Sequence, residues 1–184
     1  QDILERVAQV GLDSVVGKYR DTERYAEIEA LTAEGYEGLR KYLTGPVKSQ
    51  MMAEITDLRP DTAFVFGHTH KPFSERVRVS SYPAPVKVYN NGRWTLNGPR
   101  LDNAEGAAIV LIDDALNVAN LRIFGTPQNG CPPEIRVEML ETDERSATAF
   151  RADIDTWIAA SLDAWNALRD TAAEAYWARQ TYLL

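Results

Sequence analysis

The fold can be placed from residues 64–72, which read FVFGHTHKP. Three apolar residues suited to a buried strand run into Gly67, and the only two histidines, His68 and His70, follow with one residue between them. On an extended segment both imidazoles would project to the same side, whereas a break at Gly67 would let them diverge toward two neighbouring ions. Imidazole suits Zn, Fe, Mn or Ni, but a divalent ion needs at least four ligands, so others must come from elsewhere. The alternative is a surface turn in which both histidines bond to backbone.

A second motif, Asn90-Asn91-Gly92-Arg93-Trp94, follows downstream. The Gly-His-Thr-His stretch closely resembles the Gly-His-x-His signature near the C-terminal end of the calcineurin-like metallophosphoesterases. The second motif resembles that family's Asn-x-Gly-Ser-Trp turn, with Arg93 in place of serine. The two motifs occur in the family's order.

The resemblance implies an α/β fold, the C-terminal part of an α/β/β/α metallophosphoesterase sandwich with a two-metal centre at the strand ends. Such enzymes hydrolyse phosphoesters with a metal-bound hydroxide. By this resemblance His68 would ligate one divalent ion and His70 the other, the ions being Mn, Fe or Zn. Lys71, Asn91 and Arg93 are candidates for binding the substrate phosphate, and the alternative for all three is a solvated turn.

The family's other motifs are missing from this sequence. Asp-x-His, Gly-Asp-x-x-Asp, Gly-Asn-His-Asp/Glu and one isolated histidine should all precede Gly-His-x-His, and none occurs. We therefore expect a C-terminal portion that is inactive without the N-terminal half of the same protein. Metal-dependent turnover by the chain alone would instead require replacement carboxylates, for which the candidates are Asp61, Asp102, Asp113 and Asp114.

Two other functions compete with this one. The first is a non-catalytic association module with a metallophosphoesterase-like fold, acting through its helices. The second, a histidine hydrolase without metal, is disfavoured because no serine or cysteine with a matched acid lies near the histidine pair in sequence. The residues upstream of Gln1 would separate the phosphoesterase from the association module.

Composition narrows the class of protein. The 184 residues are 45% hydrophobic, enough for the core of one domain. A net charge of −7 and the lack of a basic block argue against a dedicated nucleic-acid surface, although metal ions could still attract a small phosphoester substrate.

Cys131 is the single cysteine, so no intrachain disulfide forms, and a reducing cytoplasm fits. No apolar run approaches the roughly 20 residues of a membrane span. No signal peptide is visible, but Gln1 is not a natural start and a signal could precede it.

Periodicity predicts helices at both ends of the chain and strands between them. Residues 1–60 are expected to be a helical segment, a possible insertion or cap beside the active site that could select substrates. Within it, two helices should meet near Thr32, and Gly45 should end the second before Pro46 begins a third. Residues 61–184 are expected to form the C-terminal half of the metallophosphoesterase domain, β-rich over 61–140 and helical over 144–182. Strands are predicted near 63–66, 76–80, 85–90, 93–97, 107–113, 117–124 and 134–140. The strand near 107–113 is expected to be covered on both faces, with a hairpin turn after it.

A stripe of apolar side chains marks the C-terminal region. The stripe predicts one amphipathic helix of about six turns, followed by a second helical stretch. We expect the stripe to pack on the chain's own sheet; the alternative is an oligomer contact, since the acidic polar face disfavours anionic lipid. The stripe consists of Phe150, Ile154, Trp157, Ile158, Ser161, Leu162, Trp165 and Leu168.

Overall fold

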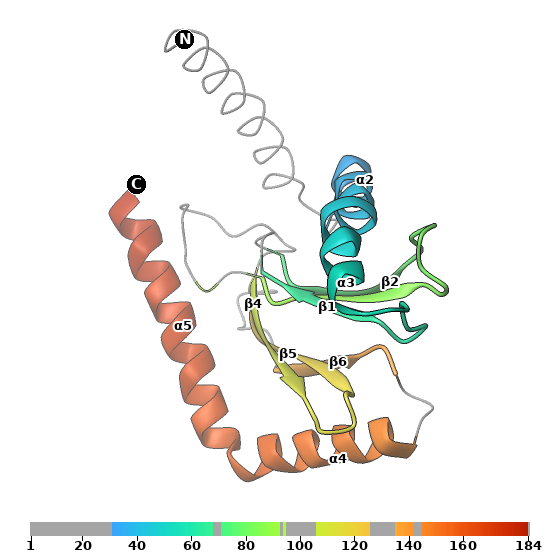
Figure 1. Cartoon of the computed structure of the whole chain (residues 1–184). Helices are drawn as coiled ribbons and strands as arrows, with labels where there is room; N and C mark the ends of the chain where they lie inside the picture. The colour runs from blue at the N-terminus through green and yellow to red at the C-terminus, as the bar shows by residue number, and fades with distance from the viewer. Residues whose placement is uncertain are drawn as a thin grey trace, which may run out of the picture.

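The computed structural model describes residues 31–67, 71–92, 94, 106–125, 135–141 and 145–183. These residues form a mixed α and β fold with two three-stranded sheets. A helical segment covers the outer face of the first sheet, and another helix runs along the outer side of the second sheet (Figure 1). The order of layers is therefore helix, sheet, sheet, helix. In the described part of the chain, no helix is both long and apolar enough to cross a membrane.

The first sheet has its last strand in the middle. It contains β1 (Ala63–Phe66), β2 (Phe73–Val77) and β3 (Val86–Asn90) in the order β1-β3-β2. Strand β3 runs parallel to β1 and antiparallel to β2, and Asn90 lies opposite both Phe66 and Phe73. Consequently β1 ends, β3 ends and β2 begins at one edge of the sheet, which we call the carboxyl edge.

The helical segment before this sheet is continuous from residue 33 to residue 54. Helix α2 (Ala33–Tyr42) begins after Thr32, whose hydroxyl accepts a hydrogen bond from the Gly35 amide at 3.1 Å, as the predicted boundary near Thr32 requires. A π-helical turn, η1 (Leu43–Val47), then leads into α3 (Lys48–Glu54). The prediction that Gly45 ends one helix and Pro46 begins another is wrong. Proline has no N–H to donate and crowds the preceding turn, and the wider π turn accommodates it without ending the helix.

This helical segment packs on the first sheet through apolar side chains. The Tyr82 hydroxyl also donates to the Leu43 carbonyl at 3.1 Å, in the turn that contains Pro46. The Tyr36 hydroxyl donates a hydrogen bond to the Glu75 carboxylate of β2. The buried side chains of this cluster are Leu31, Leu43, Phe73, Val77, Val79, Tyr82, Val86 and Val88. The assignment of residues 1–60 to a cap stays a prediction, and residues 1–30 lie outside the described residues.

The second sheet is an antiparallel meander. It consists of β4 (Gly106–Ile112), β5 (Val118–Gly125) and β6 (Arg136–Met139) in the order β4-β5-β6. The predicted hairpin turn is confirmed: the Asp113 carboxylate accepts from the Asn117 amide N–H and side chain, both at 2.8 Å. Full coverage of β4 on both faces is wrong, because Ile112 is 55% exposed where the strand runs out toward this turn.

Two helices follow the second sheet, as predicted, but the break between them falls inside the apolar stripe that was predicted to be one helix of about six turns. Helix α4 (Arg145–Ala160) ends at Ser161, whose N–H donates to the Ile158 carbonyl three residues back, at 3.1 Å. Helix α5 (Leu162–Leu183) then leaves in a different direction (Figure 1).

The change of direction divides the apolar stripe. Ile154 and Trp165 are buried with the outer face of β5, whereas Trp157, Leu162 and Leu168 are exposed by 47%, 51% and 40%. The stripe therefore packs on the chain's own sheet only in part.

Two of the predicted strands need further comment. The strand predicted at 76–80 is displaced, because β2 covers Phe73–Val77 and its apolar ends Phe73 and Val77 face the helical layer. The strand predicted at 93–97 lies outside the described residues except for Trp94, which is in a bend.

Candidate functional site

The two sequence motifs meet at the carboxyl edge. Gly67 follows β1, and Asn91 follows β3, the parallel neighbour of β1. The Asn91 N–H donates to the Phe66 carbonyl at 3.2 Å. A Cβ placed on Gly67 would lie 2.3 Å from Oδ1 of Asn91, so a side chain at position 67 would force the Asn91 side chain to move. The glycine of the histidine motif and the middle residue of the Asn-x-Gly turn are in direct contact.

Gly92 makes the turn compact. Its φ of +69° is readily available only to glycine, and its N–H donates to Oδ1 of Asn90 at 2.7 Å. A Cβ at Gly92 would lie 2.6 Å from Cδ of Pro72 and 2.3 Å from the Gly106 carbonyl oxygen. Gly67 and Pro72, on either side of the histidines, therefore both lie against residues 90–92.

The second sheet is joined to this turn by main-chain contacts. The Ala108 N–H donates to the Asn91 carbonyl at 2.9 Å, and Gly92 forms an isolated bridge with Ala107. The Trp94 indole N–H donates to the Ala108 carbonyl at 3.3 Å, while 53% of the residue remains exposed. The start of β4 is thus an extension of the Asn-x-Gly turn.

Asn120 and Arg122 of β5 also reach the first sheet. Nδ2 of Asn120 lies 3.1 Å from the Asn90 carbonyl oxygen, 3.5 Å from that of Phe73 and 3.2 Å from Oγ of Ser74. Nη1 of Arg122 donates to the Pro72 carbonyl at 2.8 Å and to Glu138 at 3.3 Å. Burial lowers the pKa of Arg122 and Glu138 opposes that shift, but a guanidinium stays charged in either case.

The sequence contains a signal for these two side chains that motif reasoning missed. Asn120 and Arg122 are polar residues two apart in a strand whose other positions are mostly apolar. Residues two apart share a face, and a polar group on a buried face requires a hydrogen-bonding partner. The alternation therefore indicates a polar partner across the inner face of the second sheet.

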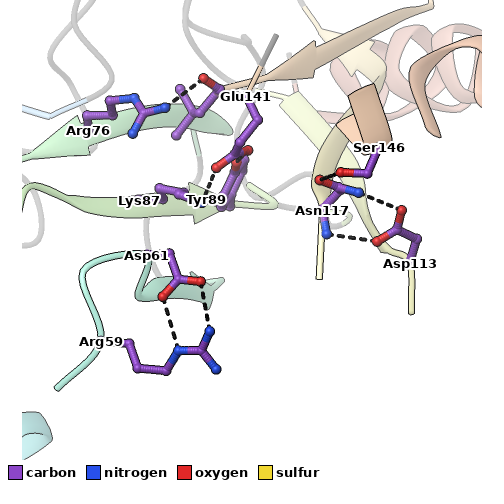
Figure 2. Close-up of polar contacts among 10 residues, drawn as sticks. Arg59, Asp61, Arg76, Lys87, Tyr89, Asp113, Asn117, Glu141 and Ser146 are labelled. Carbon is purple, nitrogen blue, oxygen red and sulfur yellow. Dashed lines mark hydrogen bonds and ion pairs between the residues drawn. The ribbon is translucent and has the colours of Figure 1, made fainter. Parts of the chain in front are cut away.

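A second polar cluster joins the sheets beside this site (Figure 2). The buried Tyr89 hydroxyl donates to Oε2 of Glu141 at 3.1 Å, and Lys87 forms an ion pair with Oε1 of the same carboxylate. Arg76 donates to the Leu140 carbonyl at 3.0 Å. Burial, followed by the neighbouring Glu141 carboxylate, raises the pKa of Tyr89. The phenol therefore stays neutral and serves as a donor to Glu141.

The predicted site residues have different outcomes. His68, His70, Arg93 and Asp102 lie outside the described residues, so their roles stay predictions. Asn91 is half-buried at the turn, beside Gly67.

Lys71 is 1% exposed, so a solvated turn is wrong for it. The reason is its position between Gly67 and Pro72, in a segment packed against the Asn-x-Gly turn. Its contact with a substrate stays a prediction.

The three replacement carboxylates that the structure describes do not gather at the carboxyl edge. Asp61 pairs with Arg59 at 3.2 Å just before β1, at the opposite end of that strand (Figure 2). Asp113 and Asp114 lie in the turn between β4 and β5. Among the described residues, no group of three or more His, Cys, Asp or Glu side chains could hold a metal ion.

Comparison of the chain with protein families, with curated proteins and with solved structures finds no match.

Proposed function

We propose that this chain is the C-terminal part of a metal-dependent phosphoester hydrolase of the calcineurin-like kind, with His68 and His70 as metal ligands. The contact between Gly67 and Asn91 carries the proposal, because it joins two motifs that are well separated in sequence. They meet at the carboxyl ends of two parallel strands, where ligand sites in α/β sheets commonly lie. The helix, sheet, sheet, helix order of layers supports the proposed sandwich.

The donor set fits a divalent ion only in part. Two imidazoles are suitable ligands for Mn, Fe or Zn, but the described residues add no cluster of carboxylates. The remaining ligands would come from an N-terminal half that carries the missing motifs. When bound, two such ions would polarise a phosphoryl oxygen and lower the pKa of water.

The chain's own residues would bind and orient the substrate. The Asn91 amide lies against Gly67, immediately before His68, where it could donate to a phosphoryl oxygen. Arg93, two residues later, would add a fixed positive charge. In this proposal the substrate is a small phosphoester and the compartment is the cytoplasm.

The test compares the chain alone with the chain supplied with its upstream half. Each would be assayed with Mn²⁺ or Zn²⁺ against an aryl phosphodiester, and metal content would be measured in both. We expect turnover only in the complete protein. His68→Ala and His70→Ala should each lower metal occupancy, and the double variant should lose little more activity than either single variant, because the ligands act as one centre.

Two outcomes would overturn the proposal. Turnover by the 184-residue chain alone would mean that other ligands complete the site. Metal content that is unchanged by both histidine substitutions would mean that the histidines are not ligands.

The exposed Trp157, Leu162 and Leu168 favour the second candidate, a non-catalytic association module. A complete protein that binds no metal but self-associates through these residues would support the module.

A further inference from the structure

The residues that follow the histidine segment are bonded to the second sheet. Residues 68–70 join Gly67 to Lys71, and the residues just beyond Lys71 are Pro72 and Phe73. The carbonyls of Pro72 and Phe73 face donors on β5: Arg122 for Pro72, at 2.8 Å, and Asn120 for Phe73, at 3.5 Å. The same Asn120 amide lies 3.1 Å from the carbonyl of Asn90, at the end of β3.

Asn120 therefore connects two segments that each carry one of the sequence motifs. Its side-chain nitrogen has two hydrogens for three nearby acceptors, and the residue is 0% exposed. Hydrogen bonds are directional, so an amide shared between Phe73 and Asn90 fixes the distance between their main chains. Without it, the Phe73 and Asn90 carbonyls would each lose one hydrogen bond and the two segments could separate.

We infer that Asn120 and Arg122 are positioning residues for the His68–His70 segment, an inference that rests on the proposed function for its consequence in metal binding. Arg122 binds the carbonyl of Pro72, two residues after His70, and Asn120 ties the start of β2 to the Asn-x-Gly turn. Metal ligands must be held within a few tenths of an ångström, and outer-shell partners that orient them typically affect metal affinity by about 10- to 100-fold.

The chain offers a matched control in Asn117. This residue is also buried, at 5% exposure, and truncation also removes two side-chain hydrogen bonds: the one its amide nitrogen donates to Asp113 Oδ2 and the one its amide oxygen accepts from the Ser146 hydroxyl (Figure 2). It lies in the turn between β4 and β5, whereas the Asn-x-Gly turn meets the opposite end of β4. Asn117→Ala and Asn120→Ala should therefore lower the melting temperature by similar amounts while differing in their effect on the histidines.

The experiment uses imidazole NMR signals, which this chain makes simple because it has only two histidines. In the chain without metal, we expect Asn120→Ala to move the ring signals of both histidines and Asn117→Ala to leave them in place. Arg122→Met should move them as well, whereas Arg122→Lys, which keeps an N–H donor for Pro72, should restore the wild-type shifts. On Zn²⁺ titration of the chain supplied with its upstream half, the apparent dissociation constant should rise by about tenfold or more only in Asn120→Ala and Arg122→Met.

The outcomes separate the two ideas. Identical histidine shifts in wild type, Asn120→Ala and Arg122→Met would overturn the positioning role, whatever the metal affinity. Equal shift changes in Asn117→Ala and Asn120→Ala would also overturn it, because a general loss of stability would then explain both. Zn²⁺ that leaves both histidine signals unchanged when the chain is supplied with its upstream half would count against the proposed function, while the shifts of the metal-free variants would still decide the positioning role.

Discussion

The outer faces of the two sheets are built differently from the interface between them. Each outer face meets a helical layer through apolar side chains such as Val88 in the first sheet and Leu121 in the second, both 0% exposed. Between the sheets, Asn120, Arg122 and Tyr89 make hydrogen bonds to the opposite side. Apolar burial is strong but non-directional, whereas buried hydrogen bonds add less net stability and fix geometry. The helical layers should therefore set how stable the fold is, and the interface should set where the candidate site lies.

The largest expected effect is on the outer side of the second sheet. Trp165 is 9% exposed, and we expect Trp165→Ala to lower the free energy of unfolding by about 3 to 5 kcal/mol. Trp157, at 47% exposure, contacts Trp165 edge-on with ring centroids 4.9 Å apart, and Trp157→Ala should cost only about 1 kcal/mol. Urea unfolding of both variants would measure the difference. Equal losses would mean that Trp157 is covered, as it would be in an oligomer.

A smaller effect is expected at the interface between the sheets. Tyr89→Phe removes a buried donor to the Glu141 carboxylate, so it should lower the free energy of unfolding by about 1.5 to 3 kcal/mol. Tyr42→Phe is the control, because Tyr42 is 59% exposed. Circular dichroism during urea unfolding would measure both variants near neutral pH.

The Tyr89→Phe variant also tests pH dependence. The pKa of Tyr89 is raised in the fold, first by burial and then by Glu141. The fold therefore favours the neutral phenol, and this stabilisation is complete below about pH 10, the ordinary tyrosine pKa, and is lost as the pH rises toward the higher folded-state value. Above about pH 10 the wild type should lose stability more steeply than Tyr89→Phe. Parallel curves for wild type and Tyr89→Phe would contradict the burial of an un-ionised phenol.

Local sequence signals predicted where helices and strands lie better than they predicted whether a helix continues or ends at a given residue. The position of the strand 63–66 and the start of a helix after Thr32 are confirmed, because an apolar run and a capping side chain act within a few residues. The expected burial of that strand is wrong, because β1 lies at the edge of its sheet and Val65 is 46% exposed. Pro46 and Ser161 were both misjudged, in opposite directions. The helix continues through Pro46, and it ends at Ser161 within an apolar stripe. Both outcomes depend on how the neighbouring turns pack on a sheet, and the periodicity of the sequence carries no information on that packing.

The two motifs of the candidate site were predicted from the sequence, but the way the two sheets bring them together was not. Gly67 and Asn91 could be singled out from the sequence, but their contact depends on β1 and β3 being parallel neighbours with β2 displaced to the far side. The burial of Lys71 follows from the same arrangement. Asn120 and Arg122 act across two sheets, so their role requires the packing of β5 on the first sheet.

The smallest expected effect is that of Gly38→Ala, which separates the contribution of helix propensity from that of packing in the helical layer of the first sheet. Gly38 lies in the interior of α2 and is exposed, and a Cβ added to it would have no other atom within 4 Å. Glycine costs a helix interior about 0.5 to 1 kcal/mol relative to alanine, so Gly38→Ala should stabilise the protein by about that amount. Leu43, at the start of the π-helical turn that follows, is 2% exposed and anchors the same helical segment on the sheet, so Leu43→Ala should instead cost about 2 to 5 kcal/mol. Thermal unfolding of the two variants would show whether the helix propensity of α2 limits the stability of the protein. A Gly38→Ala variant that is no more stable than wild type would mean that packing on the first sheet already fixes the helix.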